Sequence, residues 1–551
     1  MPELTLNGRT CSFESGQNIL QVALDNGIEV PHYCWHPSLS VVANCRICLA
    51  EVWAPNPRNG GKLEPMPKLV PTCQTMASEG QVVYTDSPKA IGNQKAVMEY
   101  LLINHPVDCP VCDQAGECHL QDYSYQYGRS QARFQEQKIK QPKKDIGPHV
   151  MLYSDRCIMC TRCVRFTREI TETGELMVDG RGAYEQIDIF PGKPLDNPLS
   201  GNVIDLCPVG ALLDKDFLFQ QRVWLLKKTP SIDGLTSSGD NISVHHNDGT
   251  VYRIKPRHNE DVNGHWITDE VRYGWKHVHS NDRFVMPLVR GAEPFGMDHA
   301  REAWDAAYAA TNARLAGTTD AAAKRVMVMV SPMLSCEDAY WLATWARSLP
   351  GDVTFAVGPV PTMGEDQVFA DGFTLRAEKA PNARGVRRVL KAMGGSIEYD
   401  AAVRDMASGG YDAVVLSGNY PSDWATEPLT NAIPDDAFVV LIDTLTGPLL
   451  ERADVVLPSA TWMEKSGTFE NADGIIQAFD RAIDPIDYCK GEAQLAIDLM
   501  AARLGEAPAA YNPANTRQQM VGELGLSEFA SITTRREDEA VVLSDMELVE
   551  L

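Results

Sequence analysis

The stretch that decides the fold runs from Arg156 to Phe166 and reads Arg-Cys-Ile-Met-Cys-Thr-Arg-Cys-Val-Arg-Phe. A Cys-Pro pair follows it at Cys207-Pro208. Bacterial two-cluster ferredoxins bind [4Fe–4S] clusters with runs of this spacing, and the last cysteine of each run, which precedes proline, binds the cluster of the other run. The stretch therefore predicts one [4Fe–4S] site, formed by Cys157, Cys160, Cys163 and Cys207.

A second cluster of the ferredoxin type is not expected beside this one. Thr167 stands where the first run would have its fourth cysteine. Counting back from Cys207, the other three cysteine positions are also filled by other residues, namely Asn197, Ser200 and Val203. One complete ligand set is therefore preserved, and the partner cluster has lost all four of its ligands.

Another group of cysteines precedes this stretch, at Cys34, Cys45, Cys48 and Cys73. Four thiolates, two of them on one tight turn, match the requirement of a [2Fe–2S] cluster, although the first gap is longer than in plant-type ferredoxins. A structural zinc ion would also take four cysteines. We expect the iron–sulfur cluster, because a hairpin and a helix of ferredoxin type precede Cys34.

Between these groups lie three closely spaced cysteines, Cys109, Cys112 and Cys118, which suit a [4Fe–4S] cluster but supply only three ligands. His105, four residues ahead of Cys109, is the nearest candidate for the fourth. Replacing one thiolate by a neutral imidazole makes a cluster less negative, which should raise its reduction potential, as in Rieske centres. The remaining ring nitrogen would carry a proton whose partner tunes the site.

Composition and charge limit the class of protein. Of 14 cysteines, only Cys336 and Cys489 lie beyond residue 207, and we expect these two and Cys11 to be ordinary thiols. The formal charge of −24 argues against a nucleic-acid partner. No apolar stretch approaches the length of a transmembrane helix, and the N-terminus lacks a leader pattern, so we expect a soluble chain in a reducing compartment.

The N-terminal region is predicted to be a β-rich domain with one helix. A hairpin turns at Asn7-Gly8, and Asn18 should cap a helix that ends near Gly27. The Pro- and Gly-rich residues 54–71 suggest a loop inserted between strands. Residues 88–104 have helical periodicity, and the basic residues 133–144 favour a solvated linker over a docking surface.

From about residue 325, short apolar strands alternate with Ala-rich helices, which indicates an α/β domain with a largely parallel sheet. The expected helices include 337–348 and 384–393. The expected strands are Val326–Val330, Val353–Val357, Ala413–Leu416, Phe438–Ile442 and Asp454–Leu457.

Residues 1–225 resemble the large iron–sulfur subunit of respiratory NADH–quinone oxidoreductase (complex I). The motifs that carry this resemblance are Pro31-His-Tyr-Cys-Trp-His, Asn44-Cys-Arg-Ile-Cys-Leu, the residues from Asn104 to Cys118, and the opening stretch. The resemblance implies a [2Fe–2S] cluster on the first group, a His-ligated [4Fe–4S] cluster on the second and a further [4Fe–4S] cluster on the third.

The remainder resembles the molybdopterin oxidoreductase superfamily, by the signature from Ala453 to Asn471 and by Thr229-Pro230-Ser231. Members of that superfamily follow Thr-Pro-Ser with a Cys-x2-Cys-x3-Cys cluster motif. Here its positions are held by other residues, and no cysteine or selenocysteine stands out as a molybdenum ligand, so we expect neither that cluster nor molybdopterin. The residues at the four cluster positions are Asp233, Thr236, Asp240 and, for the usual fourth ligand, Thr268.

The predicted fold is therefore multidomain, α+β and α/β, in five parts. These are a [2Fe–2S] ferredoxin-like β-grasp domain (1–87), a His(Cys)3 [4Fe–4S] domain (88–128), a [4Fe–4S] ferredoxin-like domain (129–220), a degenerate domain of the type that carries a [4Fe–4S] cluster beside molybdopterin (221–277) and a molybdopterin-oxidoreductase-like α/β domain without cofactor (278–551).

The family implies that this chain has no catalytic residue of its own and passes electrons from a flavin- and NADH-binding subunit towards quinone. Its partners would be that subunit and the quinone-proximal hydrophilic subunits, with the membrane arm reached indirectly. It would lie on the cytoplasmic face of a bacterial inner membrane, or on the matrix side in mitochondria. The alternatives are a diaphorase-type subunit of a soluble hydrogenase or formate dehydrogenase, and a redox sensor.

Overall fold

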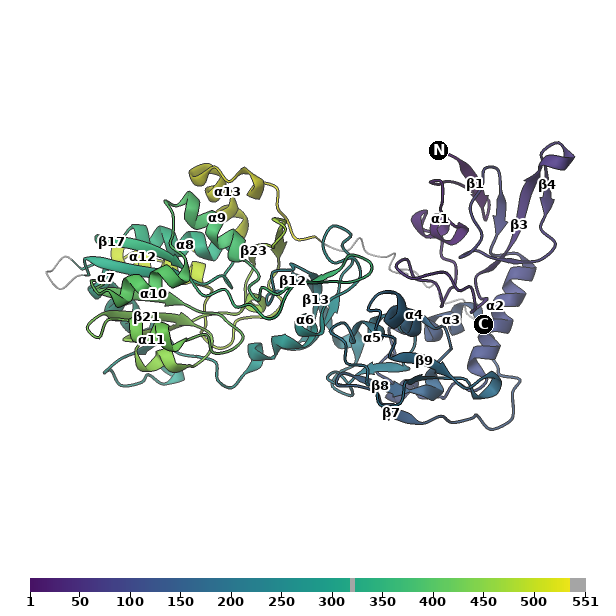
Figure 1. Ribbon diagram of the computed structural model, residues 1–551, viewed down its shortest axis with the longest axis horizontal. Helices are drawn as coiled ribbons and strands as arrows, with labels where there is room; N and C mark the ends of the chain where they lie inside the picture. Colours follow the sequence, from purple (N-terminus) through teal and green to yellow (C-terminus); the bar gives the residue numbers. More distant parts are fainter. Residues whose placement is uncertain (318–322, 536–551) are drawn as a thin grey trace. The chain divides into compact units, whose positions relative to one another are not determined.

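The computed structural model describes residues 1–317 and 323–535, and Figure 1 shows its helices and strands. The chain divides into two compact units. The first is formed by Met1–Leu226 together with residues 369–372, and the second begins at Lys227. No helix in the described ranges is long and apolar enough to cross a membrane.

The first unit opens with the predicted hairpin and helix. Strands β1 (Glu3–Leu6) and β2 (Arg9–Ser12) pair antiparallel around Asn7 and Gly8, both of which have positive φ. Helix α1 (Ile19–Asp25) begins at Asn18, which forms a reciprocal capping box with Gln21. Such a cap satisfies backbone N–H groups that the first helical turn leaves without partners.

The sheet of this region has a five-strand path, β2-β1-β6-β3-β4, and β5 pairs with β3 beside it. The first cysteine group lies in the segments before β3 and after β5. Strand β1 is parallel to β6, as expected for a β-grasp sheet packed on α1. Buried side chains of both elements, among them Leu4, Leu6, Ile19 and Val22, share one core. The remaining strands are β3 (Leu49–Asn56), β4 (Lys62–Pro65), β5 (Val70–Pro71) and β6 (Val82–Tyr84).

The prediction of a plain loop over residues 54–71 was wrong. Strand β3 continues to Asn56, turns through a short 3-10 helix (Pro57–Asn59) and returns as β4. The prolines are accommodated because they lie in the turn or at strand ends, where a missing N–H donor costs little.

The other two cysteine groups lie on short elements that follow. Helix α2 (Pro88–Leu102) matches the predicted helix, and Cys118 directly precedes α3 (His119–Tyr127). The third group lies beside a three-stranded sheet and two short helices. The elements of this region are β7 (Lys143–Asp145), β8 (Val150–Tyr153), β11 (Leu212–Asp214), α4 (Arg162–Glu169), α5 (Asn202–Leu206), β9 (Leu176–Asp179) and β10 (Gln186–Ile189).

The basic segment 133–144 is mostly exposed, as predicted, but several of its cations are anchored. Arg133 pairs with Glu99 of α2, and Nζ of Lys138 donates to the carbonyl oxygens of Leu102 and Ile103 at 2.7 and 2.9 Å. These contacts fix the segment against the C-terminus of α2, three residues ahead of His105.

The second unit begins with an antiparallel sheet, β12-β13-β14, followed by α6. Helix α6 begins after Thr268, whose side chain caps it. The bounds are Lys227–Ile232, Asn241–Asn247, Thr250–Pro256 and Asp269–Tyr273, respectively.

The predicted parallel sheet is confirmed in the second unit. Its strand order is β15-β22-β21-β20-β16-β17, parallel except for the short edge strand β15. The order reverses at β16, as in doubly wound folds. The bounds are β15 (Leu288–Val289), β16 (Arg325–Val330), β17 (Asp352–Val357), β20 (Ala413–Ser417), β21 (Phe438–Asp443) and β22 (Val455–Pro458).

Both faces of this sheet are buried. Val326, Val328 and Val330 point into one core, and Met327 and Met329 of the same strand point into the other. The first core is covered by α7 (Ala300–Leu315), α8 (Cys336–Arg347), α9 (Ala383–Ala392), α12 (Glu492–Leu504) and α13 (Pro513–Leu524). The second is covered by α10 (Tyr399–Ala407) and α11 (Glu427–Ala432).

Two small hairpins complete the second unit. They are formed by β18 (Gln367–Val368) with β19 (Thr374–Leu375), and by β23 (Gly467–Glu470) with β24 (Ile476–Phe479).

Candidate metal centres

The structure brings the first cysteine group together. The Sγ atoms of Cys48 and Cys73 lie 3.7 Å apart. Hydrogen bonding between side chains, of Cys34 with Cys45 and Cys73 and of Cys48 with Cys73, lowers the pKa of Cys34 and Cys48 and raises that of Cys45 and Cys73. Thiols that share protons in this way are close enough to act as one ligand set.

The turn that carries Cys45 and Cys48 has an unusual backbone. Ala43 and Arg46 both have positive φ, at 49° and 59°. Left-handed residues other than glycine are uncommon, and they favour concave turns whose N–H groups point inward and attract anions. The loop of the third group repeats this feature at Met159 and Thr161, with φ of 53° and 60°.

The third group encloses a small apolar pocket. All four of its cysteines line it, together with Leu152, Ile158, Ile187, Val209 and Leu212 among others. Burial raises the pKa of each thiol, and for Cys160 the value reaches about 11 although Arg162 opposes the shift. The pocket thus offers four sulfur donors in surroundings that exclude water.

Backbone groups already point at these sulfur atoms. The N–H of Met159 donates to Sγ of Cys157 at 3.3 Å. N–H groups of Val209, Leu212 and Ala211 lower the pKa of Cys207, partly offsetting its burial. Donors of this kind stabilise thiolate over thiol, so the residues present suit a thiolate-bound cluster.

The second cysteine group is less fully buried than the third. Cys112 and Cys118 are buried, whereas Cys109 is exposed, and no hydrogen bond within the described residues joins His105 to these three cysteines. The Nδ1 atom of His105 is buried without a hydrogen-bond partner. Burial, Arg156 and Lys138 lower the pKa of this imidazole to about 4, so the ring is neutral at pH 7 and retains a lone pair for a metal.

The second and third groups share a border. The backbone N–H of His119 donates to the carbonyl of Pro208 at 3.1 Å, next to Cys207. A Cβ atom on Gly210 would lie 2.3 Å from Sγ of Cys112, so only glycine allows this approach. Arg156, which ion-pairs with Asp108 at 2.9 Å, further ties the loop of the second group to that of the third.

The degenerate cluster positions of the second unit are filled by a polar network. Oδ2 of Asp233 accepts hydrogen bonds from the hydroxyls of Thr236 and Ser238, and Oδ1 accepts the N–H of Leu235. Residues 226–276 contain no cysteine. Burial raises the pKa of Asp233 to about 6. Asp233, Thr236 and Ser238 thus satisfy one another, whereas Oδ2 of Asp240 is buried without a hydrogen-bond partner. The network offers no thiolate to an iron–sulfur cluster.

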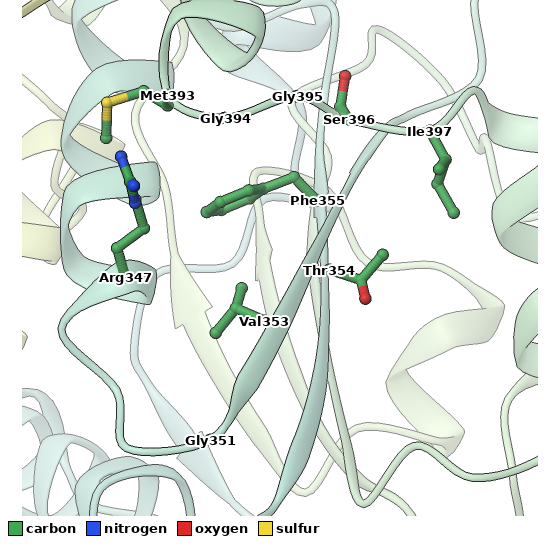
Figure 2. A pocket seen from close by; sticks show the side chains of 10 residues that line it. All are labelled: Arg347, Gly351, Val353, Thr354, Phe355, Met393, Gly394, Gly395, Ser396 and Ile397. Carbon is green, nitrogen blue, oxygen red and sulfur yellow. The ribbon is translucent and has the colours of Figure 1, made fainter.

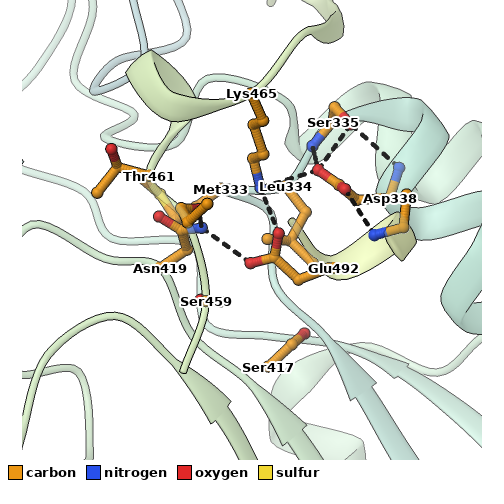
Figure 3. A network of polar contacts seen from close by, with 12 residues as sticks. Met333, Leu334, Ser335, Asp338, Ser417, Asn419, Ser459, Thr461, Lys465 and Glu492 are labelled. Carbon is orange, nitrogen blue, oxygen red and sulfur yellow. Dashed lines mark hydrogen bonds and ion pairs between the residues drawn. The ribbon is translucent and has the colours of Figure 1, made fainter. Parts of the chain in front are cut away.

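Beyond the carboxyl ends of the parallel strands, where doubly wound folds bind ligands, lies a buried ionic cluster (Figure 3). Lys465 contacts Asp338 at 2.9 Å and also Glu492, and Nδ2 of Asn419 donates to Glu492 at 2.8 Å. Ser335 caps α8 by bonding to Asp338. We call Lys465, Asp338 and Glu492 the buried ion triad.

No cysteine lines the three pockets described on the α/β part of the second unit. The pocket in Figure 2 lies along edge strand β17 and the residues after α9, and its single charged lining residue is Arg347. Cys336 is buried and contacts Asn382, and Cys489 is buried beside the carbonyl of Phe284, as predicted for ordinary thiols. Within the described ranges, no three His, Cys, Asp or Glu side chains form a ready site for a single metal ion.

Protein-family models match most of the first 276 residues. They are described as 2Fe-2S iron-sulfur cluster binding domain (2–88), NADH-ubiquinone oxidoreductase-G iron-sulfur binding region (94–133), NADH-quinone oxidoreductase subunit 3, ferredoxin-like domain (147–213) and NADH-ubiquinone oxidoreductase NDSU1/NuoG-like, 4Fe-4S domain (226–276). Residues 392–501 match the Molybdopterin oxidoreductase model.

Curated relatives agree with these matches. The chain is 44% identical over 303 residues to the mitochondrial 78 kDa subunit of NADH-ubiquinone oxidoreductase from Neurospora crassa. The alignment covers 54% of this chain and 39% of that protein. It is 38% identical over 290 residues to an NADH-quinone oxidoreductase subunit from Rickettsia felis. That alignment covers 53% of this chain and 41% of the Rickettsia protein. Residues 2–276 are therefore similar to the large iron–sulfur subunits of NADH–quinone oxidoreductases.

The matched region spans about two fifths of the length of these relatives. A solved structure of an NAD+-reducing [NiFe]-hydrogenase is also similar, with 27% identity, a TM-score of 0.34 and coverage of 40% of this chain and 91% of that one. The family-model matches confirm the predicted [2Fe–2S] domain, the [4Fe–4S] ferredoxin-like region and the molybdopterin oxidoreductase-like domain.

Sequence reasoning missed several residues around the cysteine groups. Arg162 and Arg165 follow the cysteines of the third group in the sequence, but nothing there indicated that they reach the loop of Cys34. Arg222 donates to the carbonyl of Cys112 at 2.9 Å from a segment to which no role was assigned. A basic residue close to a ligand cysteine in the sequence is the one signal that could have indicated such a contact. The tertiary fold decides which carbonyl group the arginine reaches.

Proposed function

We propose that this chain is an electron-transfer subunit of an NADH–quinone oxidoreductase and binds three iron–sulfur clusters. One [2Fe–2S] cluster would be held by Cys34, Cys45, Cys48 and Cys73. A [4Fe–4S] cluster would be held by His105, Cys109, Cys112 and Cys118, and a further one by Cys157, Cys160, Cys163 and Cys207. The observation that carries the proposal is the buried apolar pocket lined by all four cysteines of the third group.

Bound iron–sulfur clusters supply reversible one-electron oxidation and reduction. The residues of the chain would bind the clusters, exclude water from them and set their reduction potentials. Apolar side chains such as Leu152 and Ile187 exclude water from the third group, and backbone N–H groups stabilise its thiolates. Ligand type, hydrogen bonds and burial are the means by which a protein sets the potential of such a centre.

The contacts described above support an order for the three sites. The third group lies against the second through Pro208 and Gly210, and against the first through Arg162 and Arg165. Of the routes that such contacts allow, we propose the one from the first group through the third to the second. The first and second groups also touch, through the rings of Tyr33 and Tyr123.

We further propose that the chain holds neither a fourth cluster nor molybdopterin. The polar network of Asp233 replaces thiolates at the degenerate cluster positions. The two cysteines of the second unit are buried in its cores, away from the pockets described above. The second unit would then serve as a scaffold.

The partners and location are inferred from the complexes to which the relatives belong. A flavin- and NADH-binding subunit would deliver electrons, and the quinone-proximal hydrophilic subunits would receive them. The membrane arm would be reached only through those subunits. The chain would lie peripherally, on the cytoplasmic face of a bacterial inner membrane or on the matrix side in mitochondria.

Iron and sulfide analysis of the full chain, purified without oxygen, tests the cluster assignment. We expect about ten irons and ten acid-labile sulfides per chain, as two tetranuclear clusters and one binuclear cluster require. EPR of the reduced protein should show one binuclear and two tetranuclear species. A colourless chain containing zinc, or about fourteen irons, would contradict the proposal.

The His105→Cys variant tests the histidine ligand. A fourth thiolate makes the second cluster more negative, so its midpoint potential should fall while those of the other two clusters stay constant. A potentiometric EPR titration measures all three. His149→Cys provides a control, since it introduces a cysteine outside the predicted ligand groups. An unchanged potential in His105→Cys would exclude the imidazole as a ligand.

A further inference from the structure

Two buried arginines on the first turns of α4 connect the first and third cysteine groups. Arg162 donates to the carbonyl of Trp35 at 2.6 Å and to that of Leu206 at 3.3 Å. Trp35 follows Cys34, and Leu206 precedes Cys207. A single guanidinium therefore contacts the backbone beside a predicted ligand of each group.

Arg165 repeats this arrangement one turn later. Its Nη2 atom donates to the carbonyl of Cys34 and, at 3.4 Å, to that of Cys160, and its Nη1 atom donates to Ser40. Both Cys34 and Cys160 are themselves predicted ligands. The planar guanidinium suits this task because it can donate in two directions at once.

Neither arginine has an acidic partner. Arg162 and Arg165 are only 6% and 8% exposed, and in the described part of the chain no carboxylate lies within ion-pair distance of either. Glu169, on the same helix, is bonded instead to the N–H and hydroxyl of Ser40. Buried charges that lack a counter-charge are strongly unfavourable.

Negative charge on the neighbouring ligand sets would offset the buried charge of the two guanidinium groups. Thiolate-bound iron–sulfur clusters at the first and third groups would place negative charge on both sides of the arginine pair. The two cationic side chains would in turn favour the more negative, reduced form of each cluster. This charge balance depends on the cluster assignment proposed above.

We propose that Arg162 and Arg165 are positioning residues shared by two electron-transfer sites, which hold the first and third ligand loops together and raise the reduction potentials of both clusters. The inference rests on the proposed function and deepens it. It makes the two sites one electrostatic unit, because the hydrogen bonds of both guanidinium groups reach the backbone of the first and third groups.

A potentiometric titration of the full chain, followed by EPR, tests this inference. Arg165→Met removes the charge, and Arg165→Lys keeps the charge without the planar fork. Arg168→Met is the matched control, since Arg168 lies on the same helix but is exposed. Signals are assigned to the first and third groups with Cys48→Ser and Cys160→Ser.

We expect Arg165→Met to lower the midpoint potentials of the binuclear and the third-group tetranuclear signals together. The second-group signal should shift no more than in Arg168→Met, and Arg165→Lys should retain most of the wild-type potentials. Where Arg165→Met does not load its clusters, Arg165→Gln, whose amide can still donate to the carbonyl of Cys34, is titrated in its place by the same criteria.

A shift in only one of the two signals, or no larger shift than in Arg168→Met, overturns the shared role. Wild-type protein without iron–sulfur signals would instead contradict the proposed function. The two failures are therefore distinguishable in the same set of samples.

Discussion

Cys160→Ser should remove the third cluster and interrupt electron transfer through the chain. Cys160 lines the buried pocket with the other three cysteines of its group, and its carbonyl accepts a hydrogen bond from Arg165. Serine is a poor ligand for iron, and the apolar pocket offers no replacement. We expect a loss of about four irons per chain and of one tetranuclear EPR signal.

The consequence for electron transfer is larger than the loss of one signal suggests. In the proposed order of sites, an electron entering at the first group would then lack the third cluster through which it reaches the second. Stopped-flow reduction of the complex should show the first cluster reduced and the second remaining oxidised. Cys489→Ser is the control, since this buried thiol lies outside the three groups. Retention of all irons by Cys160→Ser would contradict the assignment.

Lys465→Met should strongly destabilise the second unit. The three side chains of the buried ion triad are at most 6% exposed, and the lysine is the counter-charge of two carboxylates. Although burial opposes it, Asp338 and Glu492 raise the pKa of Lys465, which keeps the amine charged. Breaking a buried pair by removing one partner costs about 3–5 kcal/mol, because it leaves an uncompensated charge.

Hydrogen exchange of the full chain in increasing urea would measure this loss separately for each unit. Amides of α8 and α12, which the triad joins, should exchange at lower urea in Lys465→Met. Arg387→Met is the matched control, since Arg387 and Glu398 form an exposed pair that should contribute less than about 1 kcal/mol. Removing the second carboxylate as well, in Lys465→Met with Glu492→Gln, should recover part of the loss. Equal effects of Lys465→Met and Arg387→Met would refute this role.

Much of the secondary structure could be predicted because local signals agreed with the fold. Asn18 caps α1 as its side chain requires, and continuous apolar runs such as Val326–Val330 form strands buried on both faces. The hairpin of β3 and β4 was missed because prolines and glycines usually mark loops. Pairing between Asn56 and Lys62 supplies the hydrogen bonds that override this local preference.

The candidate ligands could be read from spacing because a ligand turn is a local feature of sequence. Their arrangement could not. The contacts of Arg165 with Cys34, and of Gly210 with Cys112, join residues about a hundred positions apart. Contacts of this range depend on how segments that are distant in the sequence pack together, and the local spacing of cysteines does not specify that packing.

The split ligand set of the third group also affects biogenesis. Cys157, Cys160 and Cys163 leave the ribosome well before Cys207, which begins the segment that leads into β11. The early thiols must therefore remain reduced and uncommitted while the intervening polypeptide is still being synthesised. A cluster bound by all four cysteines would therefore be complete only after Cys207 has been synthesised, whereas a contiguous motif would present its ligands together.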